Sequence, residues 1–544
     1  MTSAQVDRFV HDRLPPHAQW PELRHDLPEL QLQPQLNLVQ TLFDRAEAAG
    51  HAKRPLLRSD ACTLSYSEAR AEVNRIANLL TGELGLVPGN RVLLRGGNSV
   101  PLALAWLAVV QAGLIAVATM PLLRARELGA ILTQAVPSAA LCEAKLADEL
   151  QAAWQADPRC ADLPLLLFNT SHASPNSLEA RAQTQSDSAT PCPTDASDIA
   201  LLAFTSGTTG APKAAVHSHG EVFAACETWP RHVLRATADD TVMGSPPLAF
   251  TFGLGGLLIF PMWAGACVYF PSIPYTPEAM VTLMNRVGAT ICYTAPTFYR
   301  QMAPFVKEHG VGRLRVCVSA GEGLPDATRQ LWKAASGIEM TDGIGATEMF
   351  HIFISAAPED VRRGAIGRVV PGYTAQIVDD DGHPLPSGEV GRLAVKGPTG
   401  CRYLDDARQT TYVQDGWNFP GDAFRQDADG YFFYQARTDD MIITAGYNVA
   451  GPEVESALLQ HPAVAECGVV GRADEERGMV VVAYVVLKPG EASSAAQVKA
   501  LQDHVKHTLA PYKYPRDVLF IDKLPRTETG KLQRFALRRL TTHP

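Results

Sequence analysis

Short apolar runs alternate with segments of helical pattern along the first part of the chain. The run at residues 91–94 is followed by an apolar stretch at 101–112 and by a second run at 114–118. Ser99 can cap the helix that this stretch would form, and Gly113 can end it. Because strand-like runs that alternate with helices are typical of layered proteins, the pattern predicts an α/β fold.

The same apolar stretch raises a transmembrane alternative. Across residues 101–123, Gln111 is the only strongly polar interruption. A membrane-spanning helix needs about 20 such residues without a break. The capping signals at Ser99 and Gly113 instead divide the stretch into a helix and a short strand. We therefore expect a buried helix and strand, and no association with a membrane.

A polar segment precedes the clearest strand signal. Residues 169–198 are rich in Ser, Thr, Pro and Ala and have almost no aliphatic periodicity, which predicts an exposed loop. Residues 199–204 then form a continuous apolar run typical of a buried strand. A loop of Gly, Thr and Ser follows this strand directly, and loops in that position often bind phosphate.

The pattern changes again near the C-terminus. After Asp422 the sequence is polar and turn-rich, and a new strand and helix pattern begins beyond it. The predicted division is an N-terminal domain at 1–436, a boundary at 437–440 and a small α+β domain at 441–544. In the last of these we expect a strand at 479–487 and a helix with apolar residues at helical spacing: Val498, Leu501, Val505 and Leu509.

Composition limits the possible classes of function. The chain has 544 residues, more than one hydrophobic core usually organises, and its 46% hydrophobic and 19% charged residues are ordinary for a globular protein. A formal net charge of -9 argues against general nucleic-acid binding, which depends on Lys and Arg. The ten cysteines include no CxxC pair, and the N-terminus lacks the apolar core of a signal peptide. We expect reduced cysteines and a cytoplasmic location.

The sequence TSGTTGAPK at 205–213 carries the clearest candidate chemistry. Its glycines allow backbone amides to turn toward a polyphosphate, its hydroxyl groups add donors, and Lys213 supplies a positive charge. It is not a Walker A loop, because two residues separate the glycines and Ala214 follows the lysine. A flexible surface loop is the alternative on composition alone, but the position after a buried strand favours a phosphate site.

Four further motifs follow in order. They are SAGEGLP from Ser319, DGIGATEM from Asp342, GDAFRQDADGYFFYQARTDD from Gly421 and PRTETGKLQR from Pro525. Together with TSGTTGAPK, they make nearly the whole chain resemble the acyl-adenylate-forming superfamily of acyl-CoA synthetases, peptide-synthetase adenylation domains and luciferases. The resemblance implies a large N-terminal domain of layered sheets and helices and a small mobile C-terminal domain. It also implies attack of a carboxylate on the α-phosphorus of ATP, with Mg²⁺.

The resemblance implies roles for individual residues. Thr205, Glu348 and Lys531 would be catalytic, with Glu348 as the Mg²⁺ ligand, and Asp439 would be the hinge. Without the motifs, Glu348, Lys531 and Asp439 would be interpreted as solvated turn residues. Ile344 stands where many members have an aromatic residue, so we expect aliphatic contact with adenine. The implied nucleotide-binding residues are Thr205, Ser206, Gly207, Thr208, Thr209, Gly210, Lys213, Ala320, Gly321, Glu322, Asp342, Gly343, Ile344, Gly345, Thr347, Asp422 and Arg437.

Other runs are similar to the benzoate and 2-aminobenzoate coenzyme A ligases. They are LPPHAQWPEL, PLAFTFGLGG, GATEMFHIFIS and AGYNVAGPEVE, and the last favours 2-aminobenzoate. In that subgroup the acyl pocket would comprise Phe250, Thr251, Phe252, Gly345, His351 and Ile352, and CoA would contact Ala445, Gly446, Tyr447, Lys513 and Arg516. Alternatives to these binding roles stay open. His351 can be an ordinary core histidine, and Lys513 and Arg516 can be surface cations.

The predicted function is an ATP-dependent ligase that forms an aryl-AMP and then an aryl-CoA, with 2-aminobenzoate or benzoate as the acid. Two alternatives stay open. An enzyme that loads an aryl acid onto a carrier protein would share every ATP motif, and a nucleotide-binding protein without turnover would share the loop. The expected partners are the acid, ATP, Mg²⁺ and CoA, without nucleic acid, in a monomer or a homodimer.

Overall fold

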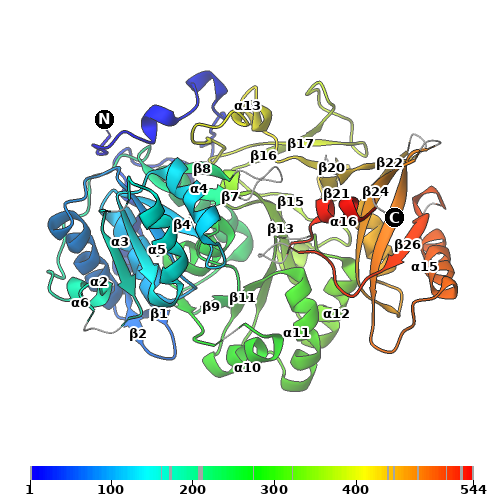
Figure 1. Cartoon of the computed structure of the whole chain (residues 1–544), viewed down its shortest axis with the longest axis horizontal. Helices are drawn as coiled ribbons and strands as arrows, with labels where there is room; N and C mark the ends of the chain where they lie inside the picture. Colours follow the sequence, from blue (N-terminus) through cyan, green and yellow to red (C-terminus); the bar gives the residue numbers. More distant parts are fainter. Residues whose placement is uncertain are drawn as a thin grey trace.

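The computed structural model describes residues 3–160, 162–170, 174–205, 212–273, 275–321, 323–437, 440–444, 447–474, 477–509, 511–526 and 531–541. These residues form four β-sheets, which we call sheets A to D. Sheets A and B are mostly parallel and lie in the larger N-terminal part, which sheet C completes. Sheet D forms the smaller C-terminal part, drawn in orange and red in Figure 1. The predicted α/β class with a smaller C-terminal unit is confirmed.

Sheet A has the strand order β6-β5-β3-β4-β7-β8, and its last strand runs antiparallel to β7. Two helices, α4 (Ala125–Ala135) and α5 (Ala147–Ala156), contribute Leu132 and Trp154 to the core on its outer face. The strands are β3 (Arg91–Arg95), β4 (Ile115–Thr119), β5 (Ala139–Glu143), β6 (Leu165–Phe168), β7 (Ile199–Thr205) and β8 (Lys213–Ser218).

Sheet B has the order β15-β14-β13-β12-β11-β9-β10-β1-β2. Its outer face is covered by α10 (Pro277–Val287), α11 (Pro296–His309) and α12 (Asp326–Ser336), whose apolar residues pack on Cys292 and Cys317. The strands are β1 (Pro55–Arg58), β2 (Thr63–Ser65), β9 (Thr241–Gly244), β10 (Cys267–Tyr269), β11 (Ile291–Thr294), β12 (Val316–Ser319), β13 (Met340–Gly345), β14 (Ile352–Ser355) and β15 (Arg368–Val369).

A central helical layer packs between sheets A and B. It contains α1 (Leu38–Ala48), α2 (Tyr66–Asn78), α3 (Val100–Gln111) and α7 (His219–Cys226), whose side chains share one core with both sheets. Because α3 is apolar on every side, it is buried along its length, and Ser99 caps it as expected. The predicted helix and the following strand are confirmed. Among the described helices, none has the length and apolar character needed to cross a membrane.

The segment at 169–198 is only in part the predicted exposed loop. It contains the short helix α6 (Leu178–Ala182), which contacts α2. Ser177 caps this helix and is fully buried, and Thr194 is also fully buried and donates its hydroxyl to the Leu36 carbonyl oxygen. Polar residues that satisfy backbone groups in this way are compatible with burial, so composition alone did not predict the helix or these buried positions.

Sheet C is antiparallel and pairs residues from 374 to 437. After β17 the chain passes back to sheet A, where Tyr403 pairs with Ala215 of β8. The elements are β16 (Thr374–Val378), β17 (Val390–Lys396), α13 (Gln409–Tyr412), β18 (Val413–Gln414), β19 (Trp417–Asn418), β20 (Asp422–Gln426) and β21 (Phe432–Arg437).

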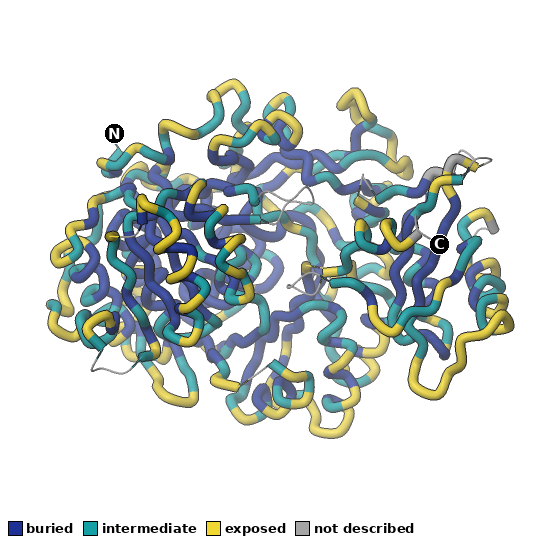
Figure 2. Tube along the Cα trace, viewed as in Figure 1, coloured by how far each residue is buried: buried dark blue, intermediate teal, exposed yellow. Residues whose placement is uncertain are grey.

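Sheet D has its own buried interior, visible as dark blue strands in Figure 2. The predicted strand and helix are both present as β25 and α15, and Leu501 and Val505 are fully buried. The elements are β22 (Ile442–Thr444), β23 (Tyr447–Val449), α14 (Gly451–Leu458), β24 (Val464–Asp474), β25 (Gly478–Leu487), α15 (Ala495–Thr508), β26 (Asp517–Phe520) and α16 (Arg534–Thr541).

Candidate active site

The sequence motifs converge at the carboxyl ends of the parallel strands. Thr205 ends β7, Ser319 ends β12 and Gly345 ends β13. The turn that follows β13, η8 (Thr347–Met349), contacts both β7 and β8. Ligands of open α/β sheets bind at this edge, so the fold brings the predicted residues of sheets A and B to one place.

Thr205 and Lys213 face each other across the hairpin of β7 and β8. The loop between them holds Ser206, Gly207, Thr208, Thr209 and Gly210, whose predicted roles fall outside the described residues. The Thr205 hydroxyl oxygen is buried and has no hydrogen-bond partner. A buried hydroxyl without a partner can bind a ligand, and the nucleotide-binding role of Thr205 stays a prediction.

Lys213, Tyr403 and Glu348 form a connected polar group. The Tyr403 hydroxyl donates to Glu348 Oε1 at 2.5 Å and lies 3.1 Å from Lys213 Nζ, while Lys213 Nζ is 3.8 Å from Glu348 Oε1. Tyr403 is 1% exposed. Burial and the nearby Glu348 charge raise the pKa of Tyr403, so its hydroxyl keeps its proton and donates.

The turn that carries Thr347 and Glu348 is also held from β8. His217 Nε2 lies 2.7 Å from the Thr347 carbonyl oxygen, and its ring packs edge-on against Phe350. Burial lowers the pKa of His217 to about 4, so the imidazole is neutral near pH 7 and donates its one N–H to this carbonyl. His217 therefore fixes the backbone of the turn from the strand that begins with Lys213.

The predicted adenine-binding residues follow β12 and lie along β13. Asp342 is fully buried, and its burial raises its pKa to about 7 although Arg329 lies 3.9 Å away. Ile344 pairs with Ile354 of β14, which agrees with an aliphatic position. Gly343 and Gly345 both require glycine, because a Cβ would lie 2.7 Å from Ile352 or 2.4 Å from the His351 carbonyl oxygen. The predicted role of Glu322 falls outside the described residues.

Asp422 and Arg437 lie opposite each other at the start of β20 and the end of β21. Arg437 Nη1 donates to both oxygens of Asp422 at 3.2 Å. Burial raises the pKa of Asp422, and the positive charges of Arg437 and Lys531 oppose this rise. The structure thus pairs these two residues, and their role at the ribose stays a prediction.

Lys531 belongs to the C-terminal part but lies next to residues of the N-terminal part. Its Cε is 4.0 Å from the position that a Cβ on Gly321 would occupy, and its charge acts on Asp422. The structure therefore brings the predicted catalytic lysine to the predicted nucleotide site.

The predicted acyl-pocket residues form an aromatic group. Phe252 lies on α8 (Thr251–Leu254), which begins directly after Phe250, and its ring is 5.5 Å from that of His351. His351 also contacts Phe260 at 4.5 Å, and Ile352 packs on Gly343. Burial lowers the pKa of His351 to about 3, an effect that the nearby Phe252 backbone opposes. His351 is thus a neutral, buried ring beside the turn of Glu348.

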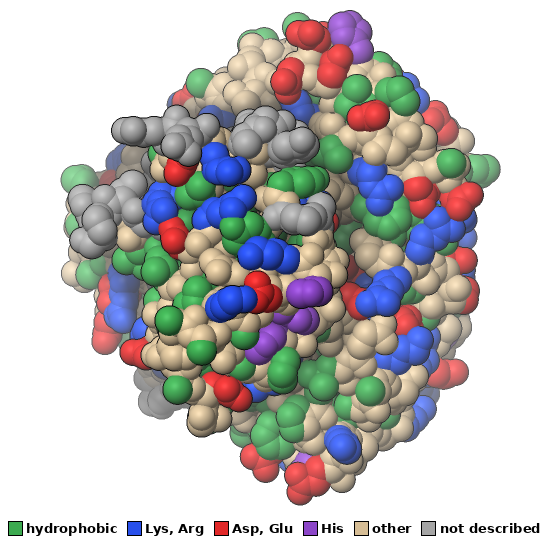
Figure 3. All heavy atoms as spheres, turned by 90° about the vertical axis from the view of Figure 1, so that its right-hand side faces the viewer, with side chains coloured by type: hydrophobic (Ala, Val, Ile, Leu, Met, Phe, Trp, Pro, Cys, Tyr) green, Lys and Arg blue, Asp and Glu red, His purple; other side chains and the backbone are tan. Residues whose placement is uncertain are grey.

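The predicted CoA contacts are only partly described. Asp439, Ala445 and Gly446 fall outside the described residues, and Tyr447 is described only as backbone of β23. Lys513 pairs with Glu453 at 2.6 Å, and Arg516 stacks on Tyr514 with its guanidinium 4.1 Å from the ring centre. Figure 3 shows this end of the molecule, where basic side chains (blue) lie among acidic ones (red). The CoA assignments stay predictions.

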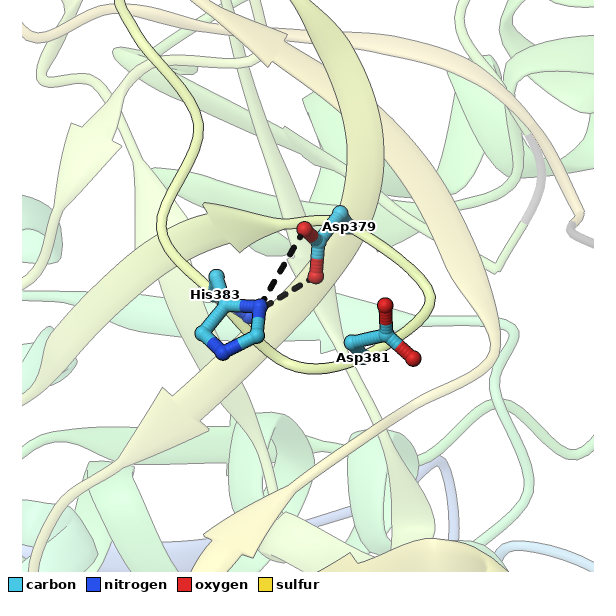
Figure 4. A group of neighbouring side chains, drawn as sticks. All are labelled: Asp379, Asp381 and His383. Carbon is cyan, nitrogen blue, oxygen red and sulfur yellow. Dashed lines mark hydrogen bonds and ion pairs between the residues drawn. The ribbon is translucent and has the colours of Figure 1, made fainter.

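A group of titratable residues lies apart from this site. Asp379, Asp381 and His383 occupy the turn between β16 and β17, and their ligand-type atoms lie within 4.8 Å of one another. Figure 4 shows His383 facing Asp379, with a distance of 3.4 Å between His383 Nδ1 and the carboxylate. We assign no role to these three residues, since they are mostly exposed and His383 already pairs with Asp379.

The site offers oxygen atoms of the kind that bind a magnesium ion. Mg²⁺ prefers oxygen ligands and is usually held by one or two carboxylates together with phosphate groups. The Glu348 carboxylate and the unpartnered Thr205 hydroxyl supply such atoms. Glu348 would hold Mg²⁺, which would neutralise charge on the leaving pyrophosphate.

Sequence reasoning missed Tyr403, His217, Trp229 and Tyr293. Trp229 and Tyr293 contact each other, with ring centres 6.3 Å apart, and Tyr293 lies 5.7 Å from Phe252. None of the four lies in one of the quoted signature motifs. The sequence offers one signal for them: His217 lies only a few residues after the predicted phosphate loop, on the strand that follows it.

Comparison with known proteins identifies the family that this chain is similar to. Residues 44–402 match the family model described as AMP-binding enzyme, and 453–531 match the AMP-binding enzyme C-terminal domain. The benzoate–CoA ligase of Thauera aromatica is 35% identical over 94% of this chain and 97% of its own. The 4-hydroxybenzoate–CoA/benzoate–CoA ligase of Rhodopseudomonas palustris is 31% identical over 93% of this chain and 94% of its own.

Two solved structures are similar over nearly their full length. The anthranilate CoA ligase AuaEII, solved with anthranoyl-AMP, has a TM-score of 0.89 and 33% identity, covering 94% of this chain and 99% of its own. A benzoate CoA ligase from Burkholderia xenovorans LB400 has a TM-score of 0.84 and 32% identity, covering 92% of this chain and 100% of its own.

Proposed function

Because the chain belongs to the AMP-binding enzyme family, we propose that it is an AMP-forming ligase that joins an aryl carboxylic acid to coenzyme A. In the first step the carboxylate attacks the α-phosphorus of ATP and pyrophosphate leaves. In the second step the CoA thiol attacks the acyl-AMP and AMP leaves. The acids proposed are 2-aminobenzoate and benzoate, which the aromatic surroundings of His351 and the names of the similar ligases support.

The observation that carries this proposal is the position of Lys531 beside Gly321 and Asp422. When a carboxylate approaches the α-phosphate, two anions meet, and a positioned ammonium group lowers the free energy of that transition state. Asp422 and Arg437 support the same assignment, since a buried carboxylate accepts from ribose hydroxyls and a guanidinium donates to ribose or phosphate.

We further propose that the C-terminal part turns about Asp439 between the two steps, with the domain boundary at 437–440. Sheet C ends at Arg437 and sheet D begins at Ile442, which supports a boundary there. CoA would then pass Ala445, Gly446 and Tyr447, with Lys513 and Arg516 toward its phosphate groups. A lysine already paired with Glu453 would have to exchange that partner for phosphate.

Pyrophosphate release from ATP, measured with a panel of aryl and short aliphatic acids, tests the proposal. We expect release that depends on an aryl acid, and an aryl-CoA product identified by mass when CoA is present. Release without any added acid, or with aliphatic acids alone, would contradict it. A carrier protein bearing phosphopantetheine, offered in place of CoA, separates the two acceptors: transfer to the carrier alone would favour the loading enzyme.

A further inference from the structure

Three buried side chains beside Phe252 have polar atoms without a hydrogen-bond partner. They are Trp229 through Nε1, Tyr293 through its hydroxyl and His351 through both ring nitrogens, which lie near the Phe252 backbone without reaching hydrogen-bond geometry. Trp229 and Tyr293 are 0% exposed and His351 is 4% exposed. A buried polar group that loses its water without gaining a partner destabilises the folded protein. The stability of the fold therefore does not explain why these polar atoms are buried without partners.

The unpartnered atoms belong to one connected group. The ring centres of Trp229 lie 6.3 Å from Tyr293 and 5.3 Å from His351. Among the described residues, these are the only two contacts in which both rings carry a polar atom without a hydrogen-bond partner. Phe252 joins the group by contacts with Tyr293 and His351. The polar atoms are thus concentrated where the acyl group is proposed to bind.

The fold satisfies comparable groups close by. Trp263 Nε1 donates to Glu227 at 2.8 Å, and the Tyr299 hydroxyl donates to the Cys292 carbonyl oxygen at 2.7 Å. Both are buried aromatic residues of the same N-terminal part. The contrast shows that the chain can pair the polar atoms of buried rings but leaves those of Trp229, Tyr293 and His351 unpaired.

Close packing holds these rings in place. A Cβ on Gly255 would lie 2.7 Å from His351 Cδ2, and a Cβ on Gly256 would lie 2.6 Å from Tyr293 Cε1. The segment after α8 therefore approaches both rings in a way that only glycine permits. Rings fixed by such contacts cannot turn freely to find a partner, so their polar atoms are held in place for a ligand.

We propose that Trp229, Tyr293 and His351 recognise an amino or hydroxyl group on the ring of the acid, so that a substituted aryl acid is preferred to benzoate. This inference rests on the proposed function, because it concerns the acid that occupies the same site.

The hydrogen-bonding capacity of the three side chains defines the class of group. An indole N–H only donates, a phenol hydroxyl donates and accepts, and a neutral imidazole has one donor and one acceptor. His351 is neutral near pH 7, because its burial lowers its pKa to about 3. Amino and hydroxyl groups both donate and accept, whereas a hydrogen, methyl or halogen substituent would leave these atoms unpaired. A site built for hydrogen bonds rejects analogues that lack them.

The test compares kcat/KM for benzoate with kcat/KM for the amino- and hydroxybenzoates in the wild-type enzyme and in Tyr293→Phe. We expect at least one substituted acid to exceed benzoate by about tenfold or more in the wild type. In Tyr293→Phe this ratio should fall by about three- to tenfold, the contribution of one hydrogen bond. Comparison of the amino with the hydroxyl series shows which group is recognised.

The melting temperature distinguishes an effect on recognition of the acid from a general change in the structure. Tyr293→Phe removes an unpartnered buried hydroxyl, so the melting temperature of the ligand-free protein should stay the same or rise. The matched control is Tyr299→Phe, which removes a hydroxyl that is paired with Cys292. It should lower the melting temperature and leave the ratio between acids unchanged.

Two outcomes would overturn the inference while leaving the proposed function intact. One is a wild-type enzyme that uses benzoate at least as well as every substituted acid. The other is a Tyr293→Phe enzyme in which all acids are affected equally. If no aryl acid supports pyrophosphate release, the proposed function itself fails, and the inference fails with it.

Discussion

The Tyr403 hydroxyl donates to Glu348 Oε1 at 2.5 Å and at the same time lies 3.1 Å from Lys213 Nζ. One tyrosine thus joins the carboxylate that we propose for Mg²⁺ and the lysine that ends the predicted phosphate loop. Tyr403 comes from the segment that returns from sheet C to β8. A side chain that orients a metal-binding carboxylate in this way affects metal binding without touching the ion.

Tyr403→Phe should weaken Mg²⁺ binding and lower kcat/KM for ATP. Removal of a partner that orients a metal ligand typically costs about 10- to 100-fold in affinity or activity. We expect the Mg²⁺ concentration for half-maximal pyrophosphate release to rise, whereas KM for the acid should change little. Titration of Mg²⁺ binding in the presence of ATP, without turnover, gives a readout that is independent of activity.

The matched control for this variant is Tyr412→Phe. The ring of Tyr412 lies 5.8 Å from that of Tyr403, and its buried hydroxyl has no hydrogen-bond partner. The same chemical change at this neighbour should leave the Mg²⁺ dependence as in the wild type. Equal shifts in both variants would show that packing, and not the bond to Glu348, is responsible.

Lys531→Ala should slow acyl-AMP formation by about 10²- to 10³-fold or more, as loss of one well-placed electrostatic donor does. Single-turnover formation of acyl-AMP from ATP and the acid measures this step. Prepared acyl-AMP supplied with CoA should be converted at close to the wild-type rate, because the proposed rotation takes Lys531 out of the site. A similar loss in both half-reactions would contradict the two-conformation mechanism.

Gly446→Trp tests the proposed path of CoA. A large side chain there should block thioester formation, while acid-dependent pyrophosphate release in a single turnover should survive. We would measure both half-reactions on the same preparation. Loss of both together, with a lower melting temperature, would indicate a folding defect and would count against a specific role for Gly446.

Arg402→Met should destabilise the N-terminal part. Arg402 forms an ion pair with Glu221, and both side chains are almost completely buried. Removing one partner of a buried pair leaves an uncompensated charge, which typically costs about 3 to 5 kcal/mol in the free energy of unfolding. Urea unfolding measures the loss. Arg8→Ala, which breaks an exposed pair with Asp12, is the control and should change that free energy by less than about 1 kcal/mol.

His219 should make the protein less stable in acid. Burial lowers its folded-state pKa from 6.5 to about 4, so between these values the unfolded state binds more protons. The contribution of His219 to stability is therefore complete above pH 6.5 and decreases as the pH falls toward 4, by about 3 kcal/mol. In His219→Asn the loss of unfolding free energy between pH 7 and pH 4 should be smaller by that amount. An identical pH dependence in both proteins would refute this assignment.

The sequence predicted those helices and strands whose formation depends on neighbouring residues. The capped helix α3, the buried strand β7 and the apolar stripe of α15 depend on residues next to one another, so the sequence alone located them. The convergence of Thr205, Glu348 and Lys531 was predicted only through the resemblance to a known family. Their spacing along the chain does not determine it.

The remaining features depend on contacts between distant parts of the chain. Tyr403 is 190 positions from Lys213, and nothing in the neighbouring sequence of either residue indicates their contact. The unpaired atoms of Trp229 and Tyr293 were equally hidden, since an aromatic residue in an apolar run is normally interpreted as core. Burial of Ser177 and Thr194 depends on backbone partners that composition does not show.

The return of the chain from sheet C to β8 also limits when the proposed ATP site can form during synthesis. A ribosome adds about 5 to 20 residues per second, so Tyr403 is made about 10 to 40 s after Lys213. Until then β8 lacks its pairing with Tyr403, and the Glu348 carboxylate lacks the hydroxyl that orients it. A nascent chain that ends before residue 403 should therefore hold a folded sheet A without a complete nucleotide site. The capacity to bind ATP should appear late in translation, after the first hydrophobic core has formed.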